Sequence, residues 1–221
     1  MPLQNRVTPT GAIVADPARG LFMGNRGILH DGRKRLGRAR WRHKHWIVCV
    51  LVFRGRRRRV MEPRRYTELF FLDEAVALAA GHRPCAECRR GRYQAFLAGW
   101  ANGTGHVGAT PKAAAFDDIL HAARIDPRHR RQLTWEASLA DLPDGTFIRL
   151  GDGDNDDVPL LVLGDALPGW TPDGYRNAMK RPRTPVVTVL TPRPTVSALA
   201  GGYMPALHPS ASGCAGHRTP P

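Results

Sequence analysis

Cysteine is scarce in this chain of 221 residues, and its four cysteines, Cys49, Cys85, Cys88 and Cys214, are unevenly spaced. So few thiols at such spacings do not make the disulfide framework of a small secreted domain. The first ten residues, MPLQNRVTPT, also lack the apolar run of a secretory signal peptide. We therefore expect a reduced, cytoplasmic protein.

Long apolar runs are missing as well. The longest, WIVCVLVF, is far shorter than the roughly 20 residues that a membrane helix needs, so we expect no membrane partner. With 42% hydrophobic residues, the chain can nevertheless bury the core of one large or two small domains. Nothing in the composition indicates an oligomeric state.

Acidic residues are rare in the first half of the chain. Residues 1–110 contain 21 Lys and Arg against 7 Asp and Glu, whereas residues 111–221 contain 12 of each, so the first half accounts for the net charge of +14. An arginine-rich composition, with 29 Arg and 4 Lys, explains the choice of Arg over Lys but not the missing acids. Clustered cations favour a polyanionic partner, because they neutralise phosphates and release counterions.

The order of expected elements indicates an α+β protein. HWIVCVLVF and VMEPRRYTELFF read as two strands, and the RGRRRR sequence between them predicts a hairpin with a basic tip. DEAVALAAG has the acidic start and glycine stop of a short helix that leads into a Cys-x-x-Cys turn, and CRRGRYQAFLAGW predicts a second helix.

Composition divides the chain into three regions. Residues 1–100 form a basic region, residues 101–115 (ANGTGHVGATPKAAA) are the best linker candidate, and residues 116–221 form a neutral region of mixed α/β character and unknown role. In the last region, FDDILHAARI and PTVSALAGG predict helices. GTFIRL, VPLLVLG and PVVTVL predict strands, and GDGDNDD predicts a polar turn between the first two of them.

The spacing of Cys85 and Cys88 is the preferred one for two thiolates on one zinc ion. Nearby arginines, Arg83, Arg89 and Arg90, would stabilise the thiolates electrostatically. A thioredoxin-like redox pair is less favoured, because that motif follows a strand and opens a helix, whereas this one follows a predicted helix.

The wider segment FFLDEAVALAAGHRPCAECRR resembles the Ada-type metal-binding domain. The resemblance covers about 20 of the 221 residues and is carried by an Asp-Glu-Ala helix start, an Ala-Gly-x-Arg-Pro-Cys turn and a second Cys, which fall on Asp73, Glu74, Ala75, Ala80, Gly81, His82, Arg83, Pro84, Cys85 and Cys88. In that family the domain binds zinc through four cysteines and contacts DNA. The resemblance therefore implies Zn²⁺ on Cys85 and Cys88, and DNA rather than RNA as the partner.

The family's earlier Cys-x-x-x-Cys is absent here, and its nearest counterpart by spacing is His45 to Cys49. On an unbroken strand these two residues lie roughly 13 Å apart and cannot share one ion. Either the backbone bends and both bind, or the site uses Cys49 alone, His43 with His45, or another histidine such as His30. Cys49 can equally be a small buried hydrophobe. The candidate ligands are thus Cys85, Cys88, Cys49 and His45.

A basic and aromatic cluster around His43 and His45 is typical of segments that contact phosphates and stack on bases. The candidate nucleic-acid-binding residues are Arg42, His43, Lys44, Arg56, Arg57, Arg58, Arg59, Arg83, Arg89 and Arg90. We therefore expect a zinc-dependent DNA-binding protein. One alternative is a nuclease or DNA-repair enzyme in which His45, Cys49 or His121 acts near the metal, and another is a metal-free interaction protein; the sequence leaves open whether the protein is an enzyme.

Overall fold

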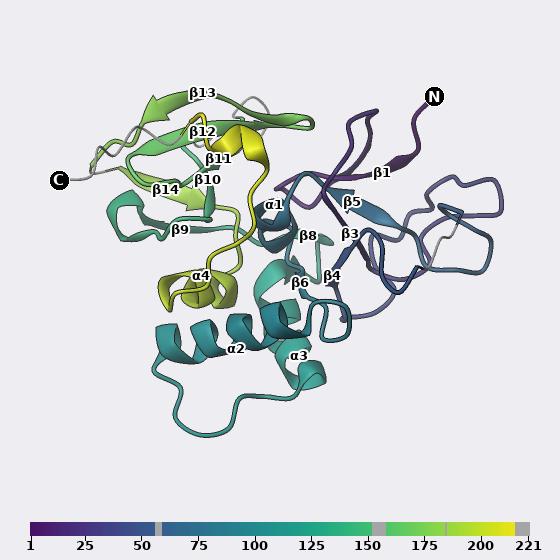
Figure 1. Cartoon of the computed structure of the whole chain (residues 1–221), viewed down its shortest axis with the longest axis horizontal. Helices are drawn as coiled ribbons and strands as arrows, with labels where there is room; N and C mark the ends of the chain where they lie inside the picture. Colours follow the sequence, from purple (N-terminus) through teal and green to yellow (C-terminus); the bar gives the residue numbers. More distant parts are fainter. Residues whose placement is uncertain (56–58, 152–157, 184, 215–221) are drawn as a thin grey trace.

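The structure, a computed structural model, describes residues 1–55, 59–151, 158–183 and 185–214. In this part of the chain, two six-stranded sheets lie on either side of the short helix α1, and three further helices gather at one end of the molecule (Figure 1). The predicted α+β class is confirmed. No helix within these ranges is both long and apolar enough to cross a membrane.

The first sheet is built from the basic region, in the order β2-β1-β5-β3-β4-β6. Its strands are β1 (Gln4–Val7), β2 (Ile13–Ala15), β3 (Phe22–Asn25), β4 (Ile47–Val50), β5 (Leu69–Phe71) and β6 (Arg83–Pro84). The predicted hairpin is wrong: β3 lies between β4 and β5 and pairs antiparallel with both. Edge strand β6 pairs parallel with β4, which brings the Cys-x-x-Cys turn beside Cys49.

The second sheet contains strands from the C-terminal half, in the order β13-β12-β11-β10-β14-β9. Its strands are β9 (Trp135–Ser138), β10 (Phe147–Arg149), β11 (Leu160–Leu161), β12 (Ala166–Thr171), β13 (Gly174–Lys180) and β14 (Val186–Val189), and β7 (Ile125–Asp126) pairs with β8 (Arg131–Gln132) in a separate ribbon. The predicted strands GTFIRL, VPLLVLG and PVVTVL are confirmed as β10, β11 and β14. The predicted turn GDGDNDD lies, except for its first residue, outside the described residues.

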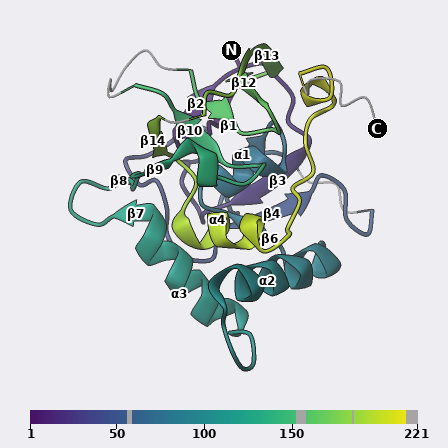
Figure 2. The ribbon, with the colours of Figure 1, turned by 90° about the vertical axis from the view of Figure 1, so that its left-hand side faces the viewer.

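The predicted helices are all present as α1 (Glu74–Ala79), α2 (Arg90–Thr104), α3 (Ala113–Arg124) and α4 (Arg193–Ala200), with short 3-10 turns at Leu139–Asp141 and Pro209–Ala211. Asp73 caps α1 by accepting a hydrogen bond from the Val76 amide. Gly81 follows with a φ of 81°, a left-handed conformation that favours glycine and turns the chain into β6. Figure 2 shows α2, α3 and α4 side by side below the sheets.

The main core is formed around α1, whose six residues are all buried. It joins apolar side chains of the first sheet, such as Val48 and Phe71, to side chains of the second, such as Phe147 and Leu161. These residues come from both sides of the segment 101–115 proposed as a linker. Residues 101–104 of that segment complete α2, and residues 105–112 connect α2 to α3.

Candidate metal centre and the basic face beside it

Three of the four cysteines meet at one edge of the first sheet. Cys49 belongs to β4, and Cys85 and Cys88 follow β6, which runs parallel to β4. The Cys85 amide donates a hydrogen bond to the Val48 carbonyl at 3.0 Å, so the parallel pairing continues into the turn. The possible ligand sulfurs of these cysteines all lie within 4.8 Å of one another.

Of the three thiols, that of Cys85 ionises most easily. A hydrogen bond from Cys49, followed by backbone amides at Cys88 and Glu87, lowers the pKa of Cys85 to about 5 against the opposing effect of burial. The same bond to Cys85 and burial raise the pKa of Cys49, and burial raises that of Cys88. The Glu87 amide lies 3.4 Å from the Cys85 sulfur. A cation would replace the two remaining thiol protons.

The donor set fits zinc. Thiolates at about 2.3 Å from a tetrahedral zinc ion lie about 3.8 Å from one another, which is compatible with the observed separation. Sulfur is a soft ligand, and three thiolates select zinc or other soft ions over magnesium and calcium. Among the described residues, no fourth His, Cys, Asp or Glu joins the cluster. These three residues would therefore leave one coordination position for a further ligand.

The structure does not bring His45, the fourth ligand expected from the sequence, to the sulfurs. Its Nδ1 atom lies 2.7 Å from an oxygen of Asp117 on α3. The Asp117 side chain is fully buried, whereas 57% of the His45 side chain is exposed. His30, another histidine considered, bonds Thr67 with Nδ1 at 2.7 Å.

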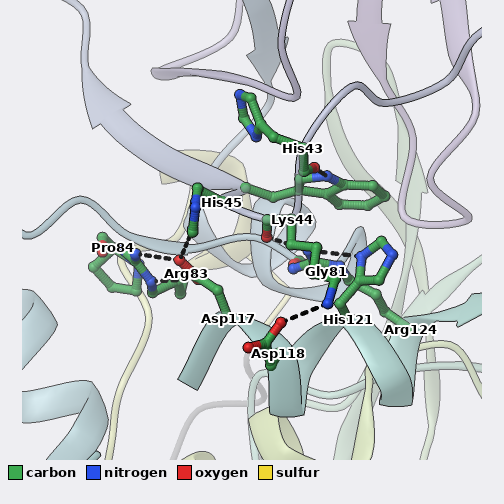
Figure 3. Close-up of polar contacts among 11 residues, drawn as sticks. His43, Lys44, His45, Gly81, Arg83, Pro84, Asp117, Asp118, His121 and Arg124 are labelled. Atoms are coloured by element: carbon green, nitrogen blue, oxygen red, sulfur yellow. Dashed lines mark hydrogen bonds and ion pairs between the residues drawn. The ribbon is translucent and has the colours of Figure 1, made fainter. Parts of the chain in front are cut away.

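Arg83 holds in place the Asp117 carboxylate that contacts His45. Both Asp117 oxygens accept hydrogen bonds from Arg83, from Nε and Nη2, each at 2.8 Å. Figure 3 shows His45 and Lys44 directed from the segment before β4 towards Asp117 and Asp118 on α3. The buried carboxylate thus fixes the imidazole orientation while more than half of the side chain stays exposed, an arrangement suited to proton transfer.

Two of the arginines expected to contact nucleic acid are buried and paired with carboxylates. Arg83 is bound to Asp117, and only 5% of its side chain is exposed. Arg89 is buried to a similar extent, forms an ion pair with Glu74 at 2.8 Å and lies over the Phe22 ring. Each guanidinium group compensates a buried carboxylate, so we do not place either residue at a nucleic-acid surface.

The other candidate residues differ in exposure. Arg42, Arg59, Arg90 and Lys44 are exposed, and Lys44 forms an exposed ion pair with Asp118. His43 is half-buried, and burial followed by the neighbouring His45 ring lowers its pKa. The remaining candidates, Arg56, Arg57 and Arg58, lie outside the described residues.

A buried tryptophan anchors the segment that carries these histidines. Trp46 packs beneath the guanidinium groups of Arg26 and Arg124, which lie 4.1 and 4.0 Å from its ring centroid. Arg124 donates hydrogen bonds to the carbonyls of Gly81 and Lys44, both at 2.6 Å. Burial lowers the pKa of each arginine to about 9. Residues 43–46 are therefore tied to α3 and to the Gly81 turn.

Sequence reasoning missed the roles of Asp117 and Arg83. Asp117 and His121 have the i, i+4 spacing of a pair on one helix, but Asp117 bonds His45, 72 residues earlier. His121 instead lies 3.2 Å from an Nη2 atom of Arg124. No local signal in the sequence indicates the partner of either residue.

Comparison of the chain with protein-family models, curated proteins and solved structures finds no match in any of the three. The fold and the site define an α+β protein with a three-cysteine cluster that can hold a metal ion. The Ada-type resemblance rests on the segment around Cys85 and Cys88 alone.

Proposed function

We propose that this chain is a zinc-dependent nucleic-acid-binding protein. The observation that carries the proposal is the convergence of Cys49, Cys85 and Cys88 from two parallel strands and the following turn. These residues would hold the ion, which would fix the edge of the first sheet and present one open coordination position. A thiolate centre also requires reduced thiols, which supports a cytoplasmic location.

Cobalt substitution tests the ligand set directly. Co²⁺ added to the reduced protein should give the sulfur-to-metal charge-transfer absorption of a thiolate site. Cys49→Ser should weaken that absorption, whereas Cys214→Ser, which removes the cysteine outside the cluster, should not. An unchanged spectrum for Cys49→Ser would remove Cys49 from the site.

The nucleic-acid part of the proposal is supported by an exposed stretch of cations before β4. Seven basic side chains are exposed between residues 33 and 44, namely Arg33, Lys34, Arg35, Arg38, Arg40, Arg42 and Lys44. Two of them pair with an acid: Arg35 with Asp31 and Lys44 with Asp118. Such a stretch can contact several consecutive phosphates. The preference for DNA over RNA rests on the Ada-type resemblance alone.

We expect Arg38→Gln/Arg42→Gln to weaken binding of duplex DNA and to reduce the slope of log K against log salt by about 2, since each lost phosphate contact removes about one unit. Fluorescence anisotropy over a salt series measures both quantities. The control, Arg128→Gln/Lys180→Gln, removes two exposed cations of the neutral half and should leave the slope unchanged. Equal slopes for all three proteins would contradict this interface.

A second candidate function is cleavage of a phosphodiester bond, and the contact between His45 and Asp117 favours it. His45 would accept the proton of the attacking hydroxyl group or water, while Asp117 holds the ring in place. Typical general-base contributions predict that His45→Ala lowers cleavage of a labelled RNA or DNA by about 100-fold or more. His129, which pairs with Asp126 on the surface, provides the control variant His129→Ala. Cleavage that survives His45→Ala would rule this function out.

A further inference from the structure

A cavity of about 420 Å³ opens beside the three sulfurs. This volume lies in the range of small-molecule sites. Its polar lining includes the three cysteines with Glu68 and Glu87, and its apolar lining includes Ile47, Phe53 and Phe70. The cavity therefore has a wide apolar wall and a few polar groups, as ligand pockets do.

Glu68 lines this cavity and has a carboxylate oxygen without a hydrogen-bond donor among the described residues. Only 4% of the residue is exposed. Its Oε2 atom accepts a hydrogen bond from the Met61 amide at 2.7 Å, whereas its Oε1 atom is buried with no hydrogen-bond partner within the described part of the chain. A buried acceptor without a donor is costly, and native structures rarely leave one unused. A cationic group in the cavity would be attracted to this carboxylate.

The charged residues in the lining indicate which charge the ligand carries. Residues 1–110 contain seven acids in all, yet two of them, Glu68 and Glu87, line this one cavity. None of the described residues that line it is Lys or Arg, although the first half is strongly basic. Within the described lining, the two carboxylates attract an organic cation rather than a phosphate.

We propose that this cavity is a binding site for a small organic cation, an amine or amidine attached to an aromatic or aliphatic body. The cationic group pairs with the Glu68 carboxylate, and the body packs against Phe53, Phe70 and Ile47. Binding at this site is separate from the nucleic-acid contact proposed above, because the exposed cations of residues 33–44 do not line the cavity. Its ligand differs in charge from the phosphates that the basic stretch would bind.

Tryptamine and its neutral analogue 3-ethylindole test the proposal on the full, zinc-loaded chain. Titrations followed by amide chemical shifts should show saturable changes at Cys49, Val50 and Glu87 with tryptamine. Because an interaction between opposite charges adds to binding, we expect tryptamine to bind at least about tenfold more tightly than 3-ethylindole. Equal affinities, or no shifts at these amides, would overturn the proposal without requiring any variant.

The variant Glu68→Gln keeps an oxygen for the Met61 amide and removes the charge. It should lower the affinity for tryptamine about tenfold and leave that for 3-ethylindole unchanged, whereas Glu62→Gln, at an exposed site, should change neither. Undiminished tryptamine binding by folded Glu68→Gln would also overturn the proposal. Zinc content and DNA affinity measured on the same samples separate this failure from a failure of the function proposed above.

Discussion

Glu74 shows how a single residue can connect distant parts of this fold. Its fully buried carboxylate forms ion pairs with Arg89 at 2.8 Å and Arg92 at 3.0 Å. It also accepts hydrogen bonds from the Tyr203 hydroxyl and the Ala206 amide. Burial alone would raise the pKa of Glu74, but Arg89 and the other donors together lower it. One side chain thus joins α1, α2 and the segment after α4.

We expect Glu74→Gln to lower the free energy of unfolding at pH 7 by about 3–5 kcal/mol, because Arg89 then remains buried without a counter-charge. Since the folded pKa lies below the ordinary value of 4.5, the stability contributed by the carboxylate is complete above pH 4.5 and is lost as the pH falls through the folded pKa. Urea denaturation at several pH values should therefore show the variant approaching wild type below pH 4.5.

The exposed Glu136 provides the control, because Glu136→Gln should match wild type across the whole pH range. A difference between Glu74→Gln and wild type that is the same at low and neutral pH would show that the ion pairs are not its cause.

For single residues, the sequence predicts the metal site only where the ligands lie close together in the chain. The spacing of Cys85 and Cys88 predicted a metal pair, and those two thiols lie in the cluster. Cys49 was one of several open candidates, because only the pairing of β4 with β6 places it beside them. The contact of His45 with Asp117 could not be predicted, since it joins two segments with no sequence pattern in common.

At the scale of the elements, α2 and α4 approach each other closely at glycines. A Cβ atom on Gly99 would lie 2.6 Å from the Ala198 carbonyl oxygen, and one on Gly201 would lie 1.9 Å from the Gly99 oxygen. Both obstacles are backbone atoms, which cannot turn away as a flexible side chain would. The two helices can pack this closely only because neither position carries a side chain.

We expect Gly99→Ala to lower the free energy of unfolding by about 1–3 kcal/mol, as overpacking usually does, despite the better helix propensity of alanine. Gly91 lies in the same helix with open space around its Cβ position, so Gly91→Ala should be neutral or stabilising by up to about 1 kcal/mol. Chemical denaturation compares the two variants. Equal effects would mean that helix propensity, rather than close packing, determines the outcome at Gly99.

Helices were predictable from sequence, and strand partners were not. The acidic start and glycine stop around α1 are local signals, and the helix ends where they indicate. The strands β4 and β5 were also recognisable, but their order in the sheet depends on β3, which comes from the irregular N-terminal segment. Consecutive strands usually pair with each other, and the weakly patterned Phe22–Asn25 has no sequence feature that places it between β4 and β5.

At the scale of the whole molecule, the charge differs between the two halves of the chain, but the core is common to both. The excess positive charge belongs to residues 1–110, whereas the core around α1 includes residues of both halves. The order of the expected elements predicts the α+β class and composition predicts a basic region, but neither shows which side chains share a core. The boundaries at 101 and 115 stay a prediction. Asp117, from the region 116–221, forms a hydrogen bond with His45 of the basic region.

The central claim is that the three clustered thiols hold one zinc ion, and zinc analysis of the reduced, purified chain tests it most directly. Wild type and Cys214→Ser should each contain about one zinc per chain, whereas Cys49→Ser and Cys85→Ser/Cys88→Ser should lose the metal together with thermal stability. A well-folded wild-type protein that contains no zinc, and takes up none when Zn²⁺ is added under reducing conditions, would contradict the account.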